Sequence, residues 1–389
     1  MSKAIVYWLA AIFATANATA QSNSPRELAM GGTAVASADS LSAGFSNPAL
    51  LTNYKGVGEK FSLLVPNLSI FISDRNNLID AMDDFNQAFD NLDAGLSSGS
   101  TTLSDLENLS ASLNGLNDKH FNIGVNTGLS LVIPSAGFGL AVVVRSAIEA
   151  DGFMNVDAAD LGLIIGADGS PSIGAIGSAA VLLGSFRNEI GIAIAKEFEI
   201  ANRNVSFGIT PKIQSFEILN VVVAADNSSN FESQINSENR VTEDGLNIDF
   251  GASMMLNDEI RVGLSARNLI SKTVAGLSGL YTYELSPALT TGIAYTNGPL
   301  TFAADLDLNT TPRFQEVAAD DSQFLRLGAE TQREWLQLRA GYIVDLKDNY
   351  ANMATAGLGF SPFGTIHFDL AGAVGENSYA GAFALSFTF

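Results

Sequence analysis

The sequence predicts an all-β fold: a closed antiparallel transmembrane β-barrel of about 14 strands, with an N-terminal plug and short helices in the first outer loop. Three features predict it. The last residues alternate strictly between two kinds of side chain, segments of strand length recur along residues 59–389, and the connections between them alternate between long and short. Together these features are typical of a barrel that crosses an outer membrane.

The alternation is strictest in residues 379–389. Successive side chains of a strand point to opposite faces, so alternate residues share a face. The bulky face carries Tyr379, Gly381, Phe383, Leu385, Phe387 and Phe389, and the small, polar-tolerant face carries Ala380, Ala382, Ala384, Ser386 and Thr388. One apolar face for lipid and one small face for the lumen is what the last strand of an outer-membrane barrel requires.

About fourteen segments have this period and a length near the 9–11 residues that a tilted strand needs to cross a bilayer. The predicted strands are 60–72, 121–133, 137–147, 186–197, 203–218, 245–256, 260–269, 287–296, 300–308, 323–332, 335–344, 354–361, 364–374 and 379–389. Long connections such as 73–120 and 148–185 alternate with short ones such as 134–136 and 198–202. Short periplasmic turns and long outer loops predict an up-and-down barrel, with an even strand number of fourteen or, alternatively, twelve or sixteen.

Charged residues fall on one face of these strands, opposite apolar rows. In 245–256, Ile248, Phe250 and Met254 alternate with Asn247 and Asp249. A charge on the lipid face costs about 2–4 kcal/mol at the bilayer midplane, so the charged face should point into the lumen. Both signs occur, and buried charges need partners. The sequence therefore predicts a luminal polar network of Asp249, Arg261, Arg267, Asp305, Asp307, Arg326, Glu330, Arg339 and Asp369.

The N-terminus predicts export. Lys3 precedes an apolar run over 5–13, and Ala18-Thr19-Ala20 is an A-x-A cleavage signal. We therefore expect a signal peptide at 1–20; the alternative, a membrane anchor, needs about 20 apolar residues and the run is shorter. The segment 21–58 is rich in small residues and lacks strand alternation, so we expect it to pack as a plug inside the barrel 59–389.

Composition excludes several classes of function. The chain has 36 glycines, no cysteine and a formal net charge of −21. Without cysteine there is no disulfide, thiol catalysis, cysteine-ligated metal or lipoprotein anchor. The acidic balance argues against nucleic-acid binding, which needs a basic surface. Beyond the N-terminal run, no stretch predicts a transmembrane helix.

The first long loop predicts helices. Leu78, Met82, Phe85, Phe89 and Leu92 recur at steps of four and three, and Leu106, Leu109, Leu113 and Leu116 do the same. Two short amphipathic helices could fold over the barrel mouth. We favour a cap that buries its own apolar stripe over a role in lining a ligand entrance.

Candidate catalytic and metal sites are weak. His367 and Asp369 share a face, but no nucleophile motif accompanies them, so a luminal histidine is favoured over a hydrolytic triad. Asp305 and Asp307 are better interpreted as two luminal carboxylates that form salt bridges to cations. The alternative, part of a Ca²⁺ site, needs about 6–8 oxygens. His120 stands alone. We predict no catalytic residue, no metal site and no cofactor.

Pro211 lies inside a predicted strand, where proline removes a ladder hydrogen bond. The hypothesis is a strand kink that opens the barrel wall sideways, and the alternative is a bulge near the rim.

The plug segment resembles a known family. Gly31-Gly32, Asp39 and the Asn47-Pro48-Ala49 turn are similar to the N-terminal plug of FadL-like outer-membrane barrels. The segments 208–212, 300–308, 336–342 and 356–364 resemble the TraF-like barrels annotated for conjugal transfer, in the same order along the chain. The resemblance implies a plugged fourteen-stranded barrel and, for the superfamily, diffusion of hydrophobic compounds. No ligand-binding residue of the family maps onto this sequence, and a thioredoxin-like protein of the same name is excluded by the missing cysteines.

The sequence and the resemblance together predict a non-enzymatic barrel in the outer membrane of a Gram-negative cell, surrounded by outer-membrane lipid. It would pass a small hydrophobic ligand through a plugged lumen. The alternative is a structural or interaction component that contacts conjugation or secretion proteins. Nucleic acid is not an expected partner.

Overall fold

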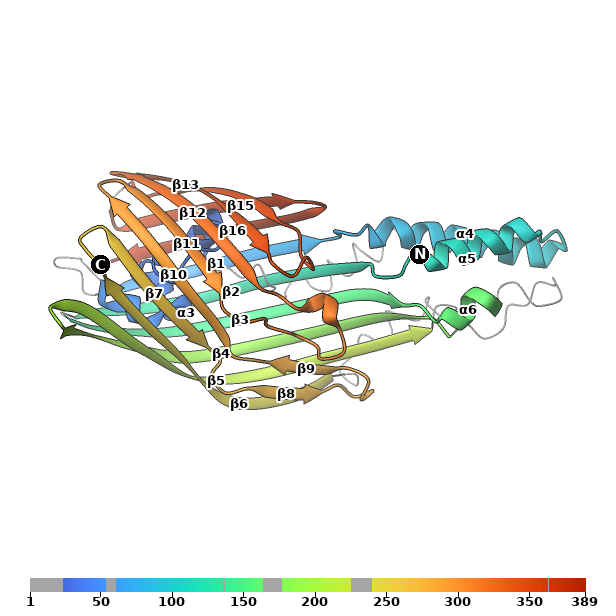
Figure 1. The fold of residues 1–389 in the computed structure, drawn as a ribbon, viewed down its shortest axis with the longest axis horizontal. Coiled ribbons are helices and arrows are strands. Elements are labelled where there is room, and N and C mark those ends of the chain that lie inside the picture. The colour runs from blue at the N-terminus through green and yellow to red at the C-terminus, as the bar shows by residue number, and fades with distance from the viewer. Residues whose placement is uncertain (1–23, 54–60, 136, 164–176, 225–239, 363) are drawn as a thin grey trace.

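Fourteen antiparallel strands close a barrel within the described part of the chain (Figure 1). The computed structural model describes residues 24–53, 61–135, 137–163, 177–224, 240–362 and 364–389. The expected signal peptide 1–20 and the ends of the expected plug segment 21–58 lie outside these residues. Each strand pairs with its neighbours in the chain, and β1 closes the barrel against β16.

Every predicted strand segment forms a strand, and the predicted fold class is confirmed. The strands are β1 Ser62–Ser73, β2 His120–Ser135, β3 Phe138–Asn155, β4 Ala179–Ile200, β5 Arg203–Ala224, β6 Arg240–Met255, β7 Ile260–Arg267, β10 Ala288–Asn297, β11 Leu300–Asp307, β12 Phe324–Arg333, β13 Leu336–Asp345, β14 Met353–Phe360, β15 Ile366–Gly375 and β16 Ser378–Thr388. β7 pairs directly with β10, because β8 Lys272–Ala275 and β9 Thr282–Leu285 form a separate hairpin. β3, β4 and β5 extend beyond their predicted outer ends.

The outer face of the wall is apolar. Ile190, Ile192 and Leu370 are between 49% and 57% exposed although they sit in the middle of strands. Exposed aromatic side chains gather at the rim of the short turns: Phe61, Phe138, Phe198, Phe207, Phe302, Trp335, Phe360 and Phe389. An apolar band with an aromatic girdle is the surface that a barrel presents to lipid, and it places the short turns at one membrane interface.

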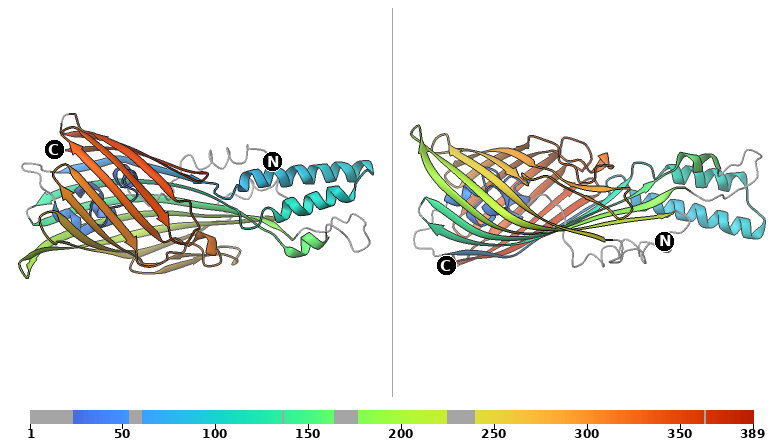
Figure 2. Two further views of the ribbon diagram at one scale, coloured as in Figure 1. Left: turned by 45° about the horizontal axis from the view of Figure 1, so that its top comes forward. Right: turned by 90° about the horizontal axis from the view of Figure 1, so that it is seen from below.

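Three short helical elements fill the lumen near the short turns (Figure 2). They are α2 Pro25–Ala29, α3 Ser40–Ser46 and the 3₁₀ helix η1 Pro48–Asn53, and we call the segment 24–53 the plug segment. Ser24 caps α2, and the Asp39 carboxylate accepts the Ser42 N–H at 2.9 Å as the cap of α3. α2 packs on β14 and β15, whereas η1 packs on β4, β5 and β6, so the plug segment spans the lumen.

The two predicted helices of the first outer loop form, but not over the barrel mouth. α4 Leu78–Ser98 and α5 Leu103–Asn114 project beyond the barrel as an arm, together with α6 Ala158–Leu163 (Figure 1). Their apolar stripes pack on each other and on the outer ends of β2–β4, through residues such as Met154. The prediction of a cap over the mouth was wrong because the long outer ends of these strands carry the helices away from it. No helix in the described residues is long and apolar enough to cross a membrane.

Candidate functional site

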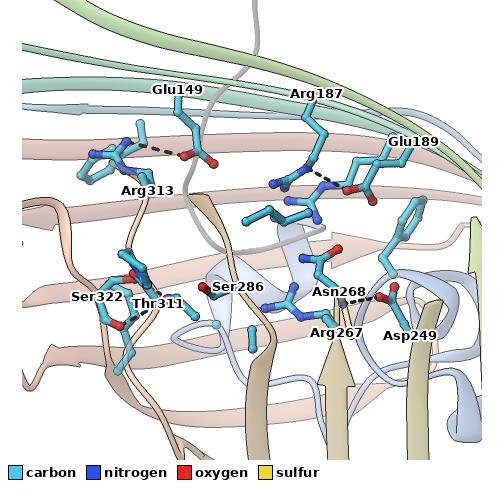
Figure 3. Close-up of a pocket in the computed structure, with 18 of the residues that line it drawn as sticks. Glu149, Arg187, Glu189, Asp249, Arg267, Asn268, Ser286, Thr311, Arg313 and Ser322 are labelled. Atoms are coloured by element: carbon cyan, nitrogen blue, oxygen red, sulfur yellow. Dashed lines mark hydrogen bonds and ion pairs between the residues drawn. The ribbon is translucent and has the colours of Figure 1, made fainter. Parts of the chain in front are cut away.

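A cavity of about 170 Å³ lies inside the barrel, on the outer side of the plug segment (Figure 3). Its floor includes Leu28 and Phe45 of the plug segment, and its roof includes Tyr283 and Arg313 from the outer loops. The walls are strands on all sides. The cavity therefore lies between a floor and a roof, and it is the candidate functional site.

The roof consists of the β8–β9 hairpin and the loop 309–322. Tyr283 and Phe314 meet edge to face, with 5.7 Å between ring centroids, and both are buried. Their cluster also contains Val274, Leu285 and Val317, and it packs on Val181, Leu183, Phe216 and Ile218 of the extended β4 and β5. The sequence predicted only loops here. The roof instead has its own apolar core, which holds it against one side of the barrel.

Arg313 fastens the roof to the adjacent strands β3 and β2. Its guanidinium lies 3.6 Å from the Glu149 carboxylate and 3.8 Å from that of Asp151 on β3, and it donates to Asn122 at 3.0 Å. Within its own loop, the Asp320 carboxylate accepts the N–H groups of Arg313 and Phe314 at 3.1 and 2.8 Å. Burial raises the pKa of Asp320 to about 7. One arginine thus connects the outer loop to buried carboxylates on β3.

One wall of the cavity is charged. Arg187 and Glu189 on β4 pair at 2.7 Å, and Lys212 on β5 pairs with Glu189 at 3.3 Å and with Asp249 on β6 at 2.9 Å. Arg187 also donates to the Tyr283 hydroxyl at 3.3 Å, which ties this wall to the roof. Of this group, only Asp249 was predicted from the sequence as a luminal charge. The alternation of Arg187 and Glu189 with the outward Ile190 and Ile192 was the signal that could have revealed the others.

The facing wall is apolar. Leu28, Phe71, Met353 and Ala380 line it, and Ile343 packs against the same cluster. All of these residues except Leu28 belong to β13, β14, β16 and β1, the strands on the side where the barrel closes. A molecule in the cavity would therefore meet hydrocarbon on one side and charged groups on the other. That arrangement suits a small hydrophobic molecule, with room for a polar group toward β4–β6.

The floor is held by backbone contacts that only glycine allows. Gly31 and Gly32 have positive φ values of 65° and 82°. Gly341 on β13 faces them so closely that a Cβ there would lie 2.2 Å from the Gly31 nitrogen. Asn47 donates to the Val35 carbonyl at 2.7 Å and to that of Ala252 at 3.2 Å. Its Oδ1 accepts the Ala49 N–H at 3.1 Å, beyond Pro48, so the Asn-Pro turn is tied to the wall.

The predicted luminal residues divide into groups rather than one network. Arg326 pairs with Asp307 at 2.7 Å. Glu330 binds Arg339 at 2.6 Å and Arg26 of the plug segment at 3.0 Å, and Arg339 also contacts Asp369. The grouping follows the register, which sets Glu330 opposite Arg339.

The other predicted luminal residues lie outside these ion-paired groups. The prediction of a salt bridge holds for Asp307 but not for Asp305, which accepts N–H groups of the plug segment and forms no ion pair among the described residues. Arg261 faces the lumen at the short-turn end, within electrostatic reach of Glu197. Arg267 lines the cavity, and no ion pair of the described residues includes it. His120, which the sequence left isolated, lies 3.1 Å from Asp151.

Pro211 lies within β5, facing lipid. β4 and β5 pair at Gly191–Lys212 and at Ile194–Ile209, but the two pairs between them are missing. The register is the same on both sides, so the alternative of a bulge does not describe this gap. The cavity reaches the wall here, because Gly191, Thr210 and Lys212 line it. The buried Thr210 hydroxyl has no hydrogen-bond partner in the described residues.

His367 and Asp369 do not assemble a hydrolytic site. The His367 ring contacts the hydroxyls of Ser361 at 2.5 Å and Thr388 at 3.4 Å, at the short-turn end of the barrel. Asp369 instead contacts Arg339. A carboxylate that orients the histidine is what a triad requires, and it is engaged elsewhere.

The fold is a closed fourteen-stranded barrel with a helical plug segment in its lumen, and several solved outer-membrane channels share it. The structure is similar to the toluene transporter TbuX of Ralstonia pickettii, with a TM-score of 0.56, 11% identity and coverage of 95% of this chain and 97% of that one. The toluene transporter TodX of P. putida gives a TM-score of 0.54, 14% identity, and coverage of 95% and 99%. A TodX mutant described as a monoaromatic hydrocarbon channel gives a TM-score of 0.55 at 15% identity. The match covers 94% of this chain and 98% of that one. At these identities the likeness shows the fold alone.

The family follows from the sequence match. Residues 44–307 match the family described as "F plasmid transfer operon, TraF, protein", and the match covers more than half of the chain. The chain belongs to this family. No curated protein matches the sequence.

Proposed function

We propose that this barrel passes small hydrophobic molecules across the outer membrane of a Gram-negative cell, after export directed by the expected signal peptide 1–20. The observation that carries the proposal is the luminal cavity between roof and plug segment, with one apolar and one charged wall. A molecule would enter under the outer loops and rest against Phe71 and Met353. It would then leave toward the periplasm past the plug segment or sideways through the wall.

The relatives support the same class of cargo. TbuX and TodX are described as toluene transporters, and the fold of this chain is like theirs. The cavity walls of this chain differ from a purely apolar tunnel, since Arg187, Glu189 and Lys212 line one side. We therefore expect hydrophobic molecules that carry a polar substituent to bind better than the parent hydrocarbon.

Mass spectrometry of molecules that co-purify with the folded protein from outer membranes tests the proposal. A stoichiometric hydrophobic molecule, lost in Phe71→Arg, is the expected result. Phe198→Arg, on the outer face at the short-turn rim, controls for damage to the barrel because it is far from the cavity lining. A folded barrel without any such molecule, together with unchanged uptake of naphthalene and 1-naphthol on deletion of the gene, would contradict transport.

The gap beside Pro211 is the proposed sideways exit. Pro211→Val restores the N–H that the β4–β5 ladder lacks, so we expect the strands to close and uptake of 1-naphthol to fall several-fold. Binding of 1-naphthol to the purified protein should not change, because Pro211 does not line the cavity. Ile213→Val on the same outward face is the control. Unchanged uptake in Pro211→Val would remove the sideways exit and leave only the path past the plug segment.

A structural role in conjugation or secretion is the second candidate, and the arm favours it. Between 78 and 114, α4 and α5 contain seven carboxylates and no Lys, Arg or His: Asp80, Asp83, Asp84, Asp90, Asp93, Asp105 and Glu107. The arm lies outside the cavity lining. Deletion of the arm should then abolish partner capture or plasmid transfer without altering uptake of 1-naphthol. Loss of uptake with intact transfer would contradict this role.

A further inference from the structure

The charged wall of the cavity holds more cations than carboxylates. Five neighbouring strands, β3 to β7, contribute charged side chains whose signs alternate from strand to strand: Arg145, Glu189, Lys212, Asp249 and Arg267. We call these five residues the charged arc, and Arg187 on β4 adds a fourth cation beside it. Because the arc begins and ends with an arginine, its two carboxylates cannot pair with every cation.

Both carboxylates of the arc already have partners. Glu189 pairs with Arg187 at 2.7 Å and with Lys212 at 3.3 Å. Asp249 pairs with the same lysine at 2.9 Å and accepts the Asn268 N–H at 2.7 Å. A carboxylate that turned toward either end of the arc would give up one of these contacts, which is costly for a buried charge. The middle of the arc is therefore satisfied without its two ends.

The arginines at the two ends face the cavity without a carboxylate. Arg145 donates to the Asn126 side chain at 3.1 Å, and no ion pair of the described residues includes Arg145 or Arg267. Figure 3 shows the Arg267 side chain directed into the cavity. Arg145 lies within electrostatic reach of Arg267, although four strands separate them along the wall. Two guanidinium groups thus converge on one space, where a shared anion would compensate both.

The other carboxylate that β3 directs into the cavity is engaged at the roof. Glu149 lies further out on this strand than Arg145, and it pairs with Arg313 at 3.6 Å. Turning it inward would release the arginine that fastens the roof. The anion that the two ends of the charged arc lack is therefore one that a ligand can supply.

The remaining surface of the cavity limits what that anion can be. Phe71 and Met353 line the facing wall, so a free inorganic ion would leave this apolar surface against water. The cavity measures about 170 Å³. A cavity of about 150 Å³ holds benzene, so one aromatic ring with a small substituent matches this space.

We propose that the cavity binds a small aromatic carboxylate, with its carboxylate between Arg145 and Arg267 and its ring against Phe71 and Met353. The inference rests on the proposed function and narrows the polar substituent of the cargo to an anionic one. The planar guanidinium fork matches a carboxylate, and the resulting hydrogen bonds are charge-assisted. A neutral ligand of the same shape leaves both arginines uncompensated, and a cationic one is repelled by them.

Three probes of nearly the same shape and different charge test the proposal. They are 4-methylbenzoate, 4-methylbenzamide and 4-methylbenzamidine, which are anionic, neutral and cationic. Isothermal titration calorimetry measures their binding to the purified full chain in detergent. We expect 4-methylbenzoate to bind about tenfold more tightly than the amide, because hydrogen bonds between charged groups are the stronger ones. The amidine should bind more weakly than the amide.

Two variants connect this preference to the ends of the arc. Arg145→Gln and Arg267→Gln should each weaken binding of 4-methylbenzoate about tenfold and leave binding of 4-methylbenzamide unchanged. Arg145→Lys and Arg267→Lys keep the charge but lose the planar fork, so they should retain part of the preference. They also serve where a glutamine variant does not fold. Arg261→Gln is the control, because Arg261 lies on the same face of β7 but outside the cavity lining.

Each outcome decides between the two proposals. Equal binding of the benzoate and the amide, or tighter binding of the amidine, would overturn the anionic site and leave the proposed function standing. So would an affinity for 4-methylbenzoate that is unchanged in both glutamine variants. Inorganic phosphate that binds as tightly as 4-methylbenzoate would show that the arginines hold any anion, and would overturn the assignment to an aromatic ligand. Failure of all three probes and of 1-naphthol to bind would overturn the proposed function as well.

Discussion

The two ends of the luminal cavity are closed by different means. At the floor, the plug segment touches the wall backbone to backbone, as at Gly31 and Gly341, where a Cβ on Gly341 would lie 2.2 Å from the Gly31 nitrogen. At the roof, two loop segments share an apolar cluster that packs on β4 and β5, and Arg313 binds the neighbouring strand β3. A contact between backbones has no rotamers through which to adjust, whereas a side chain can swing away. The comparison suggests that the floor moves as a unit and the roof opens piecewise.

The largest expected effect is at the floor. Gly341→Val places a branched side chain where the Gly31 backbone lies, so the plug segment must shift. Overpacking costs about 1–3 kcal/mol and occasionally more, and here no flexible side chain is available to move aside. We expect cells that produce this variant to become sensitive to large antibiotics that normally do not cross the outer membrane. The measurement is the minimal inhibitory concentration of vancomycin.

Gly381→Val is the matched control for this floor contact. Gly381 lies in β16, and no atom lies within 4 Å of the position that its Cβ would take. This variant should leave the vancomycin sensitivity unchanged. Equal sensitivity of the two variants would show that glycines in the wall serve strand geometry rather than the fit of the plug segment.

The next largest effect is expected at the ion pairs that hold the plug segment to the wall. Glu330 binds both Arg26 of the plug segment and Arg339 of the wall, and its side chain is 8% exposed. Removing one partner from a buried ion pair costs about 3–5 kcal/mol, because the remaining charge is left uncompensated. Glu330→Gln should lower the midpoint of denaturant unfolding in detergent accordingly. Glu107→Gln on the exposed surface of α5 should not, and an equal change in both variants would contradict the role of the pair.

Most of the barrel wall could be predicted from the sequence. A period of two is a local property, so the outward row Ile248, Phe250 and Met254 and the alternation of loop lengths were enough to place every strand. The ends of β3, β4 and β5 were not predicted, because above the membrane both of their faces pack on protein. Leu182 and Leu183 are both buried, and with both faces apolar the alternation disappears.

The site was predicted only in part, for a different reason. Which charges face the lumen follows from alternation, but which charges pair follows from register between strands far apart in the chain. Glu330 and Arg339 form an ion pair because the β12–β13 hairpin places them opposite each other. The turn at 334–335 is short, so this register depends only on residues close together in the chain. Lys212 meets Glu189 and Asp249 across two ladders. Arg313 comes from a loop without period, and nothing in its neighbourhood predicted its contact with Glu149.

At the roof, a single side chain should control a local opening. Arg313→Met keeps the length of the side chain and removes the contacts with Glu149, Asp151 and Asn122. Hydrogen bonds to charged groups contribute about 1.5–3 kcal/mol each, but the apolar cluster around Tyr283 and Phe314 remains. We expect faster hydrogen exchange at amides of 309–322 with no change in the global unfolding midpoint.

Arg203→Met is the control for the roof. Arg203 lies at the short-turn end, where it donates to the Leu256 carbonyl at 2.8 Å in an exposed position. Exchange at 309–322 should be the same in this variant as in the parent protein. A lower global midpoint in Arg313→Met would show that the roof is part of the same cooperative unit as the floor, which would remove the contrast between the two ends.

The smallest effect is expected in the arm, which touches neither end of the cavity. Asp105 and Thr102 form a capping box at the start of α5, where the Asp105 carboxylate accepts the Thr102 N–H at 2.8 Å. The side-chain and backbone hydrogen bonds from Thr102 hold the pKa of Asp105 below its ordinary value of 3.8. The cap therefore contributes stability above pH 3.8 and loses it as the pH falls through the lowered folded pKa. Hydrogen exchange at the first turn of α5 should accelerate in this acid window, and Asp105→Asn should remove the pH dependence. Acceleration at the floor over the same window would mean that arm and barrel unfold together.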